Sequence, residues 1–433
     1  MAGLSAAAWS VRQGRSVVLV EKGELGGSAR LAGFIWTAPS VEVLREAIPD
    51  GDPRLGERLI EGFGPAVEWV RSLGVECLPA VEVLRFGRGH QTSILNYLRA
   101  CELAIRESPG SEIVAPGAAR ALLVENGEVR GAEIAEPSGG VREVRAAATL
   151  LATGGFQGDP DLRTTLIDPQ ARDIPLRANA FSRGDGLRLG LSVGAQFGPE
   201  DAGFYGHLMP SGVEFGENED FPALTLYYSE HAVLLNLEGR RFVDETVGDH
   251  LTTLALLRQP EARGLLVHDE RARTEWILRP YVEGVLGADT FDTCYRRGAR
   301  CAVANNFDEF LYIPEEWGYD AAAVRKALID FNRQCAEGTP DPPRRFDAVA
   351  IDRPPFYVIE TVPAITFTFG GLLIDEDARV LDGDGQPIPG LLAAGADAGG
   401  LYVRAYAGGL AAALVFGLRA ARTAVERAGA VSR

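Results

Sequence analysis

Lysine is almost absent from this chain of 433 residues. Only Lys22 and Lys326 are lysines among the 43 basic residues, so nearly every cationic side chain is an arginine. We interpret this first as coding bias, because a composition rich in arginine, alanine and glycine follows from GC-rich codons. Acidic residues are in excess, and the net charge of −17 argues against nucleic acid or an anionic membrane as a partner.

Paired cysteines, targeting segments and long apolar runs are missing as well. No C-x-x-C pair occurs, and no apolar run approaches the ~18 residues of a membrane span. The chain does not open with a basic region followed by an apolar core and a cleavage site. We therefore expect a soluble, cytoplasmic protein without a membrane span, with its thiols reduced. The five cysteines are Cys77, Cys101, Cys294, Cys301 and Cys335.

Motifs of metal-dependent and serine hydrolysis are also lacking. The sequence has no H-E-x-x-H, no G-x-S-x-G and no clustered Cys/His pattern, so we expect no metal site. Its 433 residues exceed what one hydrophobic core usually serves, and we expect two domains. Aromatic residues gather after about residue 204 and the strand–helix alternation stops there, which predicts an inserted domain over 206–355, between parts of a first domain over 1–205 and 356–433.

The first 36 residues resemble a βαβ unit that lacks its first strand. A small-residue helix over 4–13 is followed by Gly14 and by a Val-rich strand over 16–20, which we expect to be buried on both faces. In a G-x-G-x-x-G fingerprint, Met1, Ala2 and Gly3 would fill the last three places. We expect that Met1 is an internal methionine of such a loop and that the first strand and G-x-G precede it; the upstream coding DNA tests this.

Glu21 closes the strand about 20 residues beyond the glycines, where the acidic residue that binds a ribose hydroxyl is expected. Gly26 and Gly27 follow, and consecutive glycines allow backbone N–H groups to approach a pyrophosphate or a flat ring. A βαβ unit without a nucleotide remains the alternative.

Two later strands also end in glycines. The buried run over 147–152 leads into Thr153-Gly154-Gly155, and the run over 388–394 leads into Gly395 and Asp397. Ligands of open α/β sheets bind beyond the carboxyl ends of the strands, so both ends predict contacts with one cofactor. Gly408 and Gly409 then open a helix over 408–428, whose first amides would face a developing negative charge. The alternatives are a tight turn for Gly154-Gly155 and close helix packing for the last helix.

Periodicity predicts further elements of the first domain. Apolar spacing predicts helices over 55–73 and 93–106, and the loop Arg183-Gly184-Asp185-Gly186 begins a helix that ends at Gly194. Short alternating runs over 121–124, 129–134 and 141–144 predict a hairpin or meander around an Asn-Gly turn.

Six ordered segments resemble the succinate dehydrogenase/fumarate reductase flavoprotein superfamily. They read EKGELGGSARLAGFIW, LLATGGF, RGDGLRLGLSVGA, GRRFVDE, TFGGLLIDEDARVLDGDGQPIPGLLAAGADAGG and YAGGLAAALVFGLRAA, and together they span nearly the whole chain. Within the superfamily they most resemble the 3-ketosteroid Δ1-dehydrogenase and tricarballylate dehydrogenase branch. The resemblance implies an α/β fold: a Rossmann-like FAD-binding domain and an inserted α+β capping domain that closes over a small-molecule substrate.

The candidate cofactor contacts come from the strand ends and from this resemblance. They are Gly3, Glu21, Lys22, Gly26, Gly27, Ser28, Gly33, Ala119, Ala152, Thr153, Gly154, Gly155, Asp185, Gly395, Asp397, Gly408, Gly409 and Leu410.

The catalytic positions depart from those of the fumarate reductases. Those enzymes have an arginine proton donor shortly after the R-F-V-N-E motif, whereas here Glu245 is followed by Gly248 and Asp249. Phe367 and its neighbours stand in place of a histidine pair, and Tyr406 replaces a late arginine. A fumarate reductase is therefore not expected.

Three residues are the candidates for catalysis. The segment Tyr406-Ala407-Gly408-Gly409 resembles the Y-P-G-G pattern of the ketosteroid branch, so we predict Tyr406 as acid/base or oxyanion donor, with packing on the flavin as the alternative. Arg404 would hold a substrate carboxylate or form a salt bridge to carboxylates of the cap. His207 would contact the substrate or be an ordinary core or surface histidine; His250 and Arg241 have a similar standing at the cap.

The expected function is an FAD-dependent oxidoreductase that introduces or reduces a C=C bond next to a carbonyl or carboxylate, by hydride transfer at flavin N5. A flavin-free remnant that serves as a binding or interaction protein is the alternative. The substrate, the direction of reaction, the electron acceptor and the oligomeric state stay open.

Overall fold

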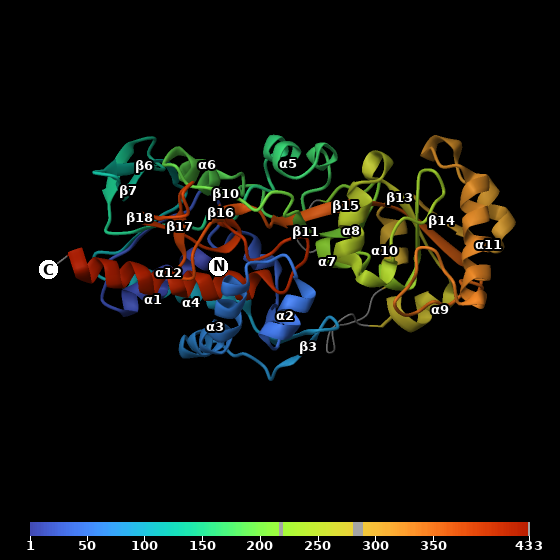
Figure 1. Cartoon of the computed structure of the whole chain (residues 1–433), viewed down its shortest axis with the longest axis horizontal. Helices are drawn as coiled ribbons and strands as arrows, with labels where there is room; N and C mark the ends of the chain where they lie inside the picture. Colours follow the sequence, from blue (N-terminus) through green and yellow to red (C-terminus); the bar gives the residue numbers. More distant parts are fainter. Residues whose placement is uncertain (216–219, 280–288, 432–433) are drawn as a thin grey trace. The chain divides into compact units, whose positions relative to one another are not determined.

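The computed structural model describes residues 1–215, 220–279 and 289–431, which divide into two units (Figure 1). Unit 1 comprises Met1–Ile167, Ala178–Phe204 and Phe367–Arg433; unit 2 comprises Asp168–Arg177 and Tyr205–Thr366. The expected α/β fold with an inserted α+β domain is confirmed. The units differ from the predicted domain limits in that residues 168–177, Tyr205 and residues 356–366 belong to unit 2.

Unit 1 alternates helices with short strands. Its helices are α1 (Ala2–Arg12), α2 (Val41–Ala47), α3 (Pro53–Ser72), α4 (Ile94–Arg106), α5 (Pro160–Leu166), α6 (Asp185–Ser192) and α12 (Gly409–Val431). Its strands are β1 (Val18–Val20), β2 (Phe34–Thr37), β3 (Val81–Val83), β4 (Gly87–Gln91), β5 (Glu112–Val114), β6 (Ala118–Glu125), β7 (Glu128–Ala135), β8 (Val141–Arg145), β9 (Thr149–Leu151), β10 (Phe197–Gly198), β16 (Gly371–Leu373), β17 (Arg379–Leu381), β18 (Pro387–Ala393) and β19 (Ala398–Gly399).

Parallel pairs form the nucleotide-fold part of unit 1. Strand β1 pairs with β5, and β9 pairs with β18, which is flanked by antiparallel β17. Strands β6, β7 and β8 form the predicted meander. We expected the Val-rich strand over 16–20 to be buried on both faces. This is wrong, because all three residues of the observed strand β1 are only partly buried. Among the described residues β1 pairs with β5 alone, and a two-stranded sheet offers few neighbours to cover it.

Local signals explain the helix limits. Asp52 caps α3, accepting a hydrogen bond from the Arg54 N–H at 2.8 Å, and Pro53 fills the first turn, where no N–H partner is lost. Helix α1 ends before Gly14, which adopts a φ of +74°. The alanines of α1 allow it to pack closely against α12 and α4, and α1 and α12 lie side by side in Figure 1.

Unit 2 is built on a mixed set of strands and short helices. Its strands are β11 (Phe204–Pro210), β12 (Val233–Asn236), β13 (Gly264–His268), β14 (Cys301–Ala304) and β15 (Phe356–Thr368), and its α-helices are α7 (Asp220–Leu224), α8 (Asp249–Leu257), α9 (Glu270–Ala272), α10 (Thr290–Arg296) and α11 (Ala321–Glu337). The strand order is β11-β15-β13-β12, and β14 also pairs with β15.

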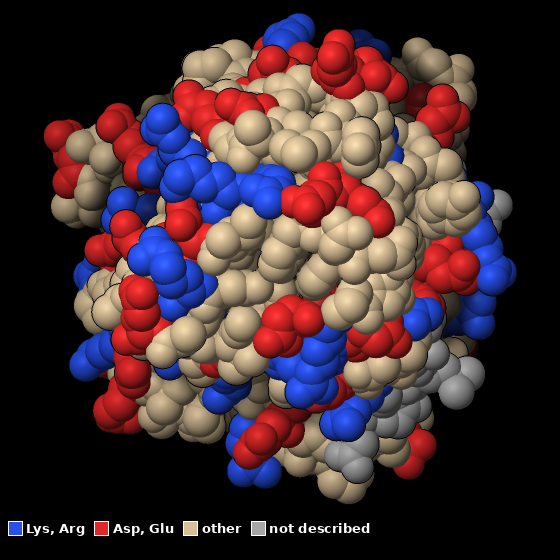
Figure 2. Space-filling model, turned by 90° about the vertical axis from the view of Figure 1, so that its right-hand side faces the viewer, with Lys and Arg blue, Asp and Glu red and all other residues tan. Residues whose placement is uncertain are grey.

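Helix α11 covers this sheet with an apolar face. Val324, Leu328 and Phe331 pack with Val233 and Leu265 of the sheet in one buried cluster. Figure 2 looks onto the end of the molecule that carries α11 in Figure 1, and it shows basic and acidic side chains interspersed with uncharged ones. The described residues on this face therefore form no continuous basic surface of the kind that binds nucleic acid.

Within the described ranges no helix has the length and apolar character needed to cross a bilayer, as the sequence predicts. The five cysteines are free thiols.

His268, at the end of β13, generates a prediction about stability. Its ring is fully buried against Tyr357 and Tyr228, and neither ring nitrogen has a hydrogen-bond partner in the described part of the chain. Burial lowers the pKa of His268 from its ordinary 6.5 to about 3. Between these two values the unfolded chain binds a proton that the folded protein excludes, so the free energy of unfolding falls by up to about 1.4 kcal/mol per pH unit as the pH decreases.

We expect that His268→Phe removes this contribution. Denaturant unfolding of both proteins at several pH values from 7 to 4 measures it, since the difference between the two curves isolates His268 from the carboxylates. Parallel curves would contradict the prediction.

Candidate functional site

Strands β9 and β18 end side by side, and Asp397 joins the segments that follow them. Leu151 lies opposite Ala393 in the parallel register, so residues 152–155 and 394–397 leave the sheet at one edge. The buried carboxylate of Asp397 accepts hydrogen bonds from the backbone N–H of Thr153, from the Thr153 hydroxyl at 3.0 Å and from the N–H of Gly155 at 3.1 Å. Burial raises the pKa of Asp397, and these donors oppose the shift.

Helix α1 begins at the same edge, and α12 passes it in its second turn. A Cβ placed on Gly395 would lie 3.4 Å from the Cβ of Ala2 in α1 and 3.8 Å from the Cβ of Ala413 in α12. A Cβ on Gly3 would lie 3.4 Å from the Cβ of Ala152. Neither helix has an acidic side chain in its first turn, so the amide groups of both first turns suit an anionic ligand. We call residues 152–155 and 394–397, with the first turns of α1 and α12, the strand-end cluster.

Gly408, directly before α12, lies close to the backbone of strand β2. Gly408 has a φ of +92°, and a Cβ there would lie 1.7 Å from the carbonyl oxygen of Trp36. The Tyr402 hydroxyl donates to the carbonyl oxygens of Ala407 and Gly408, at 3.0 and 2.9 Å. Strand β2 and Tyr402 thus fix the position at which Gly409 and Leu410 begin the helix.

Glu21, at the end of β1, lies in a second group of predicted residues. Its carboxylate accepts from the N–H of Gly23 at 2.7 Å, and its carbonyl oxygen accepts from the N–H of Gly117 at 2.7 Å. The latter bond brings the start of β6, which contains Ala119, to the end of β1. Lys22 forms an ion pair with Asp185 in the first turn of α6. The sequence did not predict that Lys22 and Asp185 form an ion pair with each other.

The Gly26-Gly27-Ser28 segment starts the short helix η1 (Gly27–Leu31), with Gly26 at a φ of +99°. The Ser28 hydroxyl accepts from the Asn179 N–H at 3.0 Å, and a Cβ on Gly27 would lie 3.2 Å from the Asn179 amide nitrogen. A Cβ on Gly33 would meet nothing within 4 Å. Gly33 is therefore not required by packing in this structure.

Tyr406 lies in an aromatic group that precedes α12. Its ring makes edge contacts with Trp36, Phe367 and Tyr402, with centroid distances of 5.2, 5.7 and 5.8 Å. Tyr406 is partly buried, whereas Tyr402 is buried and its pKa lies well above the ordinary value, through burial and the neighbouring Tyr406. The ring of Tyr406 is thus held by packing, and its role in proton transfer stays a prediction.

Arg404 makes ion pairs within unit 1. Its guanidinium lies 2.6 Å from Asp50 and 3.7 Å from Asp201, and its side chain is 50% exposed. The structure therefore favours a salt bridge, with carboxylates of unit 1 rather than of the cap. A substrate carboxylate would have to compete with Asp50 for this guanidinium.

His207 in unit 2 is paired with Asp249. Its Nδ1 bonds to one carboxylate oxygen of Asp249, while the other oxygen accepts from the N–H of Leu208 at 3.0 Å. Tyr205 and Tyr227 contact the imidazole with ring centroids at 4.8 and 5.2 Å. Burial lowers the pKa of His207, and Asp249 opposes that effect. His250 contacts the ring of Tyr205.

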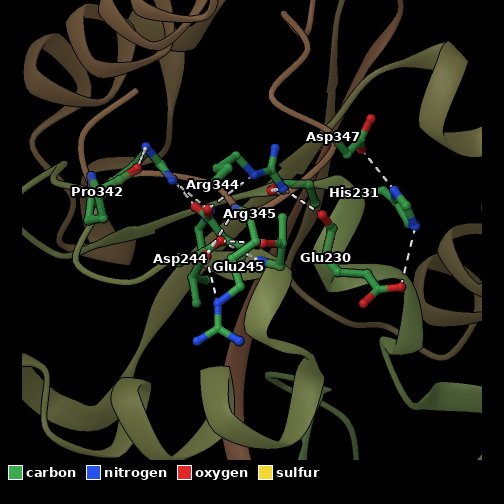
Figure 3. Close-up of polar contacts among 12 residues, drawn as sticks. Glu230, His231, Asp244, Glu245, Pro342, Arg344, Arg345 and Asp347 are labelled. Atoms are coloured by element: carbon green, nitrogen blue, oxygen red, sulfur yellow. Dashed lines mark hydrogen bonds and ion pairs between the residues drawn. The ribbon is translucent and has the colours of Figure 1, made fainter. Parts of the chain in front are cut away.

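Arg241 is occupied by a buried carboxylate in the segment that resembles R-F-V-D-E. Its guanidinium donates to Glu245 at 2.6 and 3.0 Å and to the carbonyl oxygen of Pro342 at 2.9 Å. Glu245 is fully buried, and the guanidinium of Arg344 also lies near its carboxylate, at 3.7 Å (Figure 3). The side chain of Arg241 is only 4% exposed, so the structure gives it a structural role in place of a contact with an acidic substrate.

A second His–Asp pair lies in the same unit. Figure 3 shows His231 between Asp347 and Glu230, with the Nδ1 atom 2.8 Å from Asp347. The imidazole stacks on Trp276 with a centroid distance of 3.8 Å, and Arg271 also donates to Asp347 at 3.1 Å. The imidazole of His231 thus lies among Trp276, Asp347 and Glu230 inside the protein.

Residues 1–411 match the family described as FAD binding domain. The chain belongs to this family. Membership implies FAD as the cofactor and agrees with the superfamily that the sequence resembles, and the strand-end cluster fits such a ligand. Glycines with positive φ at Gly154 and Gly155 and two helix N-termini present backbone amides there. No cluster of His, Cys, Asp or Glu suited to a metal ion occurs in the described residues.

Relatives and solved structures span several reactions of this class. The urocanate reductase of Eggerthella lenta is 27% identical over 442 residues, covering 92% of this chain and 68% of the relative. An open flavocytochrome c3 fumarate reductase has a TM-score of 0.73 at 22% identity and covers 99% of this chain and 77% of its own. The 3-ketosteroid Δ1-dehydrogenase of Sterolibacterium denitrificans has a TM-score of 0.77 at 18% identity, covering 98% of both chains. Reductases and ketosteroid dehydrogenases are both present, so the branch is not resolved.

The sequence did not predict the contacts of two residues in these sites, Asn179 and Asp249. Asn179 follows a loop without a motif, and its contact with Ser28 spans 151 positions. Asp249 was seen in the sequence only as the carboxylate that follows Gly248, a few residues after the motif. No spacing rule links it to His207, 42 positions earlier.

Gly408 gives a test of the strand-end cluster. We expect Gly408→Ala to destabilise the protein by roughly 2–4 kcal/mol and to lower its content of bound FAD, because the added Cβ collides with Trp36 and the φ is unfavourable. Gly64→Ala in α3 is the matched control: a Cβ there meets nothing within 4 Å, so stability is kept or raised. Thermal unfolding and flavin absorbance measure both; equal behaviour of the two variants would contradict the role of Gly408.

Proposed function

We propose that this chain is an FAD-dependent oxidoreductase that introduces or reduces a C=C bond next to a carbonyl or carboxylate. The observation that carries the proposal is the strand-end cluster, where two parallel strand ends with positive-φ glycines lie against the first residue of α1 and near the beginning of α12. FAD, when bound, supplies or accepts the hydride. The first turns of α1 and α12 would bind its negative charges through their amide groups.

Tyr406 is the proposed contact with the substrate beside the flavin. Its hydroxyl would move a proton or donate a hydrogen bond to the substrate oxygen, and the packing against Trp36, Phe367 and Tyr402 would keep the phenol in one orientation. Tyr402 supports this arrangement because its hydroxyl holds the backbone immediately after Tyr406.

The substrate we propose carries a single polarising group. Fumarate reductases are expected to use arginine and histidine where this chain has Tyr406, Phe367 and Thr368. A second carboxylate on the substrate would therefore lack cationic partners. Urocanate and 3-ketosteroids, named for two of the relatives, represent an unsaturated acid with a heteroaromatic ring and an apolar ketone.

A panel of substrates tests this reading. The purified protein should show flavin absorbance and should reduce urocanate, or oxidise or reduce a 3-ketosteroid, with an artificial electron dye. We expect fumarate to be at least about tenfold slower than the best substrate, because its second carboxylate is unpaired. Protein that stays colourless after incubation with FAD would contradict the proposal, and fumarate as the best substrate would contradict its substrate class.

Tyr406→Phe tests the residue. We expect turnover to fall roughly 100-fold or more, with bound flavin unchanged, because the variant keeps the ring packing and loses only the hydroxyl. Tyr312→Phe, at a side chain that is 82% exposed, is the control and should keep full activity. Wild-type turnover in Tyr406→Phe, with flavin bound, would show that the phenol only packs.

A further inference from the structure

Phe181 is an exposed aromatic side chain in the loop that precedes α6, within unit 1. Its exposed fraction is 51%, so about half of the residue is open to a ligand. The ring packs against Gly23: a Cβ placed on Gly23 would lie 2.5 Å from Cδ2 of Phe181 and 3.0 Å from its Cγ and Cε2 atoms. The ring can therefore take this position only because residue 23 has no side chain.

Hydrogen bonds hold the loop on both sides of Phe181. On one side, the Asn179 side-chain oxygen accepts from the N–H of Phe181 at 2.7 Å, and the Asn179 N–H donates to the Ser28 hydroxyl at 3.0 Å. On the other side, the carbonyl oxygen of Ser182 accepts from the N–H of Gly158 at 2.8 Å. The loop is thus bonded to the segments that follow β1 and β9. A ring presented on such a loop loses little conformational freedom when a ligand covers it.

Gly23 also connects the ring to the predicted ribose site. Glu21 closes β1, where the acidic residue that binds a ribose hydroxyl of a dinucleotide is expected. The Oε1 atom of Glu21 accepts from the N–H of Gly23 at 2.7 Å, so this carboxylate and the ring of Phe181 contact the same residue. The base of a dinucleotide is attached to that ribose and therefore lies next to the carboxylate. Phe181 offers an exposed aromatic surface at this place.

We propose that Phe181 is the aromatic contact for the adenine ring of FAD. The inference rests on the proposed function, in which FAD is the cofactor. Adenine is uncharged at neutral pH and has a flat π surface, so an aromatic side chain binds it without a hydrogen bond to a particular atom. The strand-end cluster follows β9 and β18 instead, so Phe181 acts on the adenosine half of the cofactor. It thereby favours FAD over FMN, which has no adenine.

Three ligands separate a contact with adenine from a general effect on the fold. The full chain, stripped of flavin, is titrated calorimetrically with FAD, ADP and FMN. In Phe181→Ala we expect binding of FAD and of ADP to weaken roughly 5- to 100-fold, whereas binding of FMN should change less than about twofold. Leu103→Ala in α4 is the matched control, because it removes another exposed apolar side chain of unit 1, 57% exposed. It should leave all three affinities unchanged.

Two further variants test the ring and its position. Phe181→Trp keeps an aromatic surface, and ADP should quench the emission that this tryptophan adds to that of the wild type, because stacking on a purine quenches indole fluorescence. Gly23→Ala keeps Phe181 but forces its ring to move, since the added Cβ would lie 2.5 Å from Cδ2. FAD and ADP should both bind more weakly to this variant, and FMN should not.

The outcomes distinguish this inference from the proposed function. Unchanged FAD or ADP affinity in Phe181→Ala, an equal loss of FMN affinity, or unquenched emission of Phe181→Trp with ADP would overturn the role of Phe181. Each of these results leaves FAD as the cofactor. A wild-type chain that binds no FAD would overturn both.

Discussion

The buried carboxylate of Asp397 is the interaction on which the rest of unit 1 depends. An ionised carboxylate is costly to bury, and its cost is offset only if donors surround it. Here the donors come from Thr153 and Gly155, in a chain segment that is 242 or more positions away. By collecting these donors, Asp397 fixes where β9 ends relative to β18. The position of Gly395 against Ala2 of α1 and Ala413 of α12 follows from that.

Unit 2 uses buried carboxylates in two different ways. Glu245 receives the guanidinium of Arg241, the N–H of Leu234 and the charge of Arg344, so its hydrogen-bonding capacity is spent inside the protein. Asp249 instead accepts the N–H of Leu208 and bonds Nδ1 of His207, so it fixes the imidazole on β11. Removal of either carboxylate would leave buried groups without their partner and would cost stability.

Local pattern and long-range pairing were not equally predictable. The helices, the meander and the strand ends followed from periodicity and from glycines, because these depend on neighbours within a few positions. At Gly408 the structure shows a packing reason for glycine, because the backbone of Trp36 leaves no room for a side chain, and its contact with the cofactor stays a prediction. By contrast, Arg241 looked free to bind an acid, and only the fold shows that it reaches Glu245 and Pro342. Arg404 likewise meets Asp50, 354 positions earlier, which no spacing rule predicts. The prediction that β1 is buried on both faces failed for the same reason, because the burial of a strand depends on which strands lie beside it.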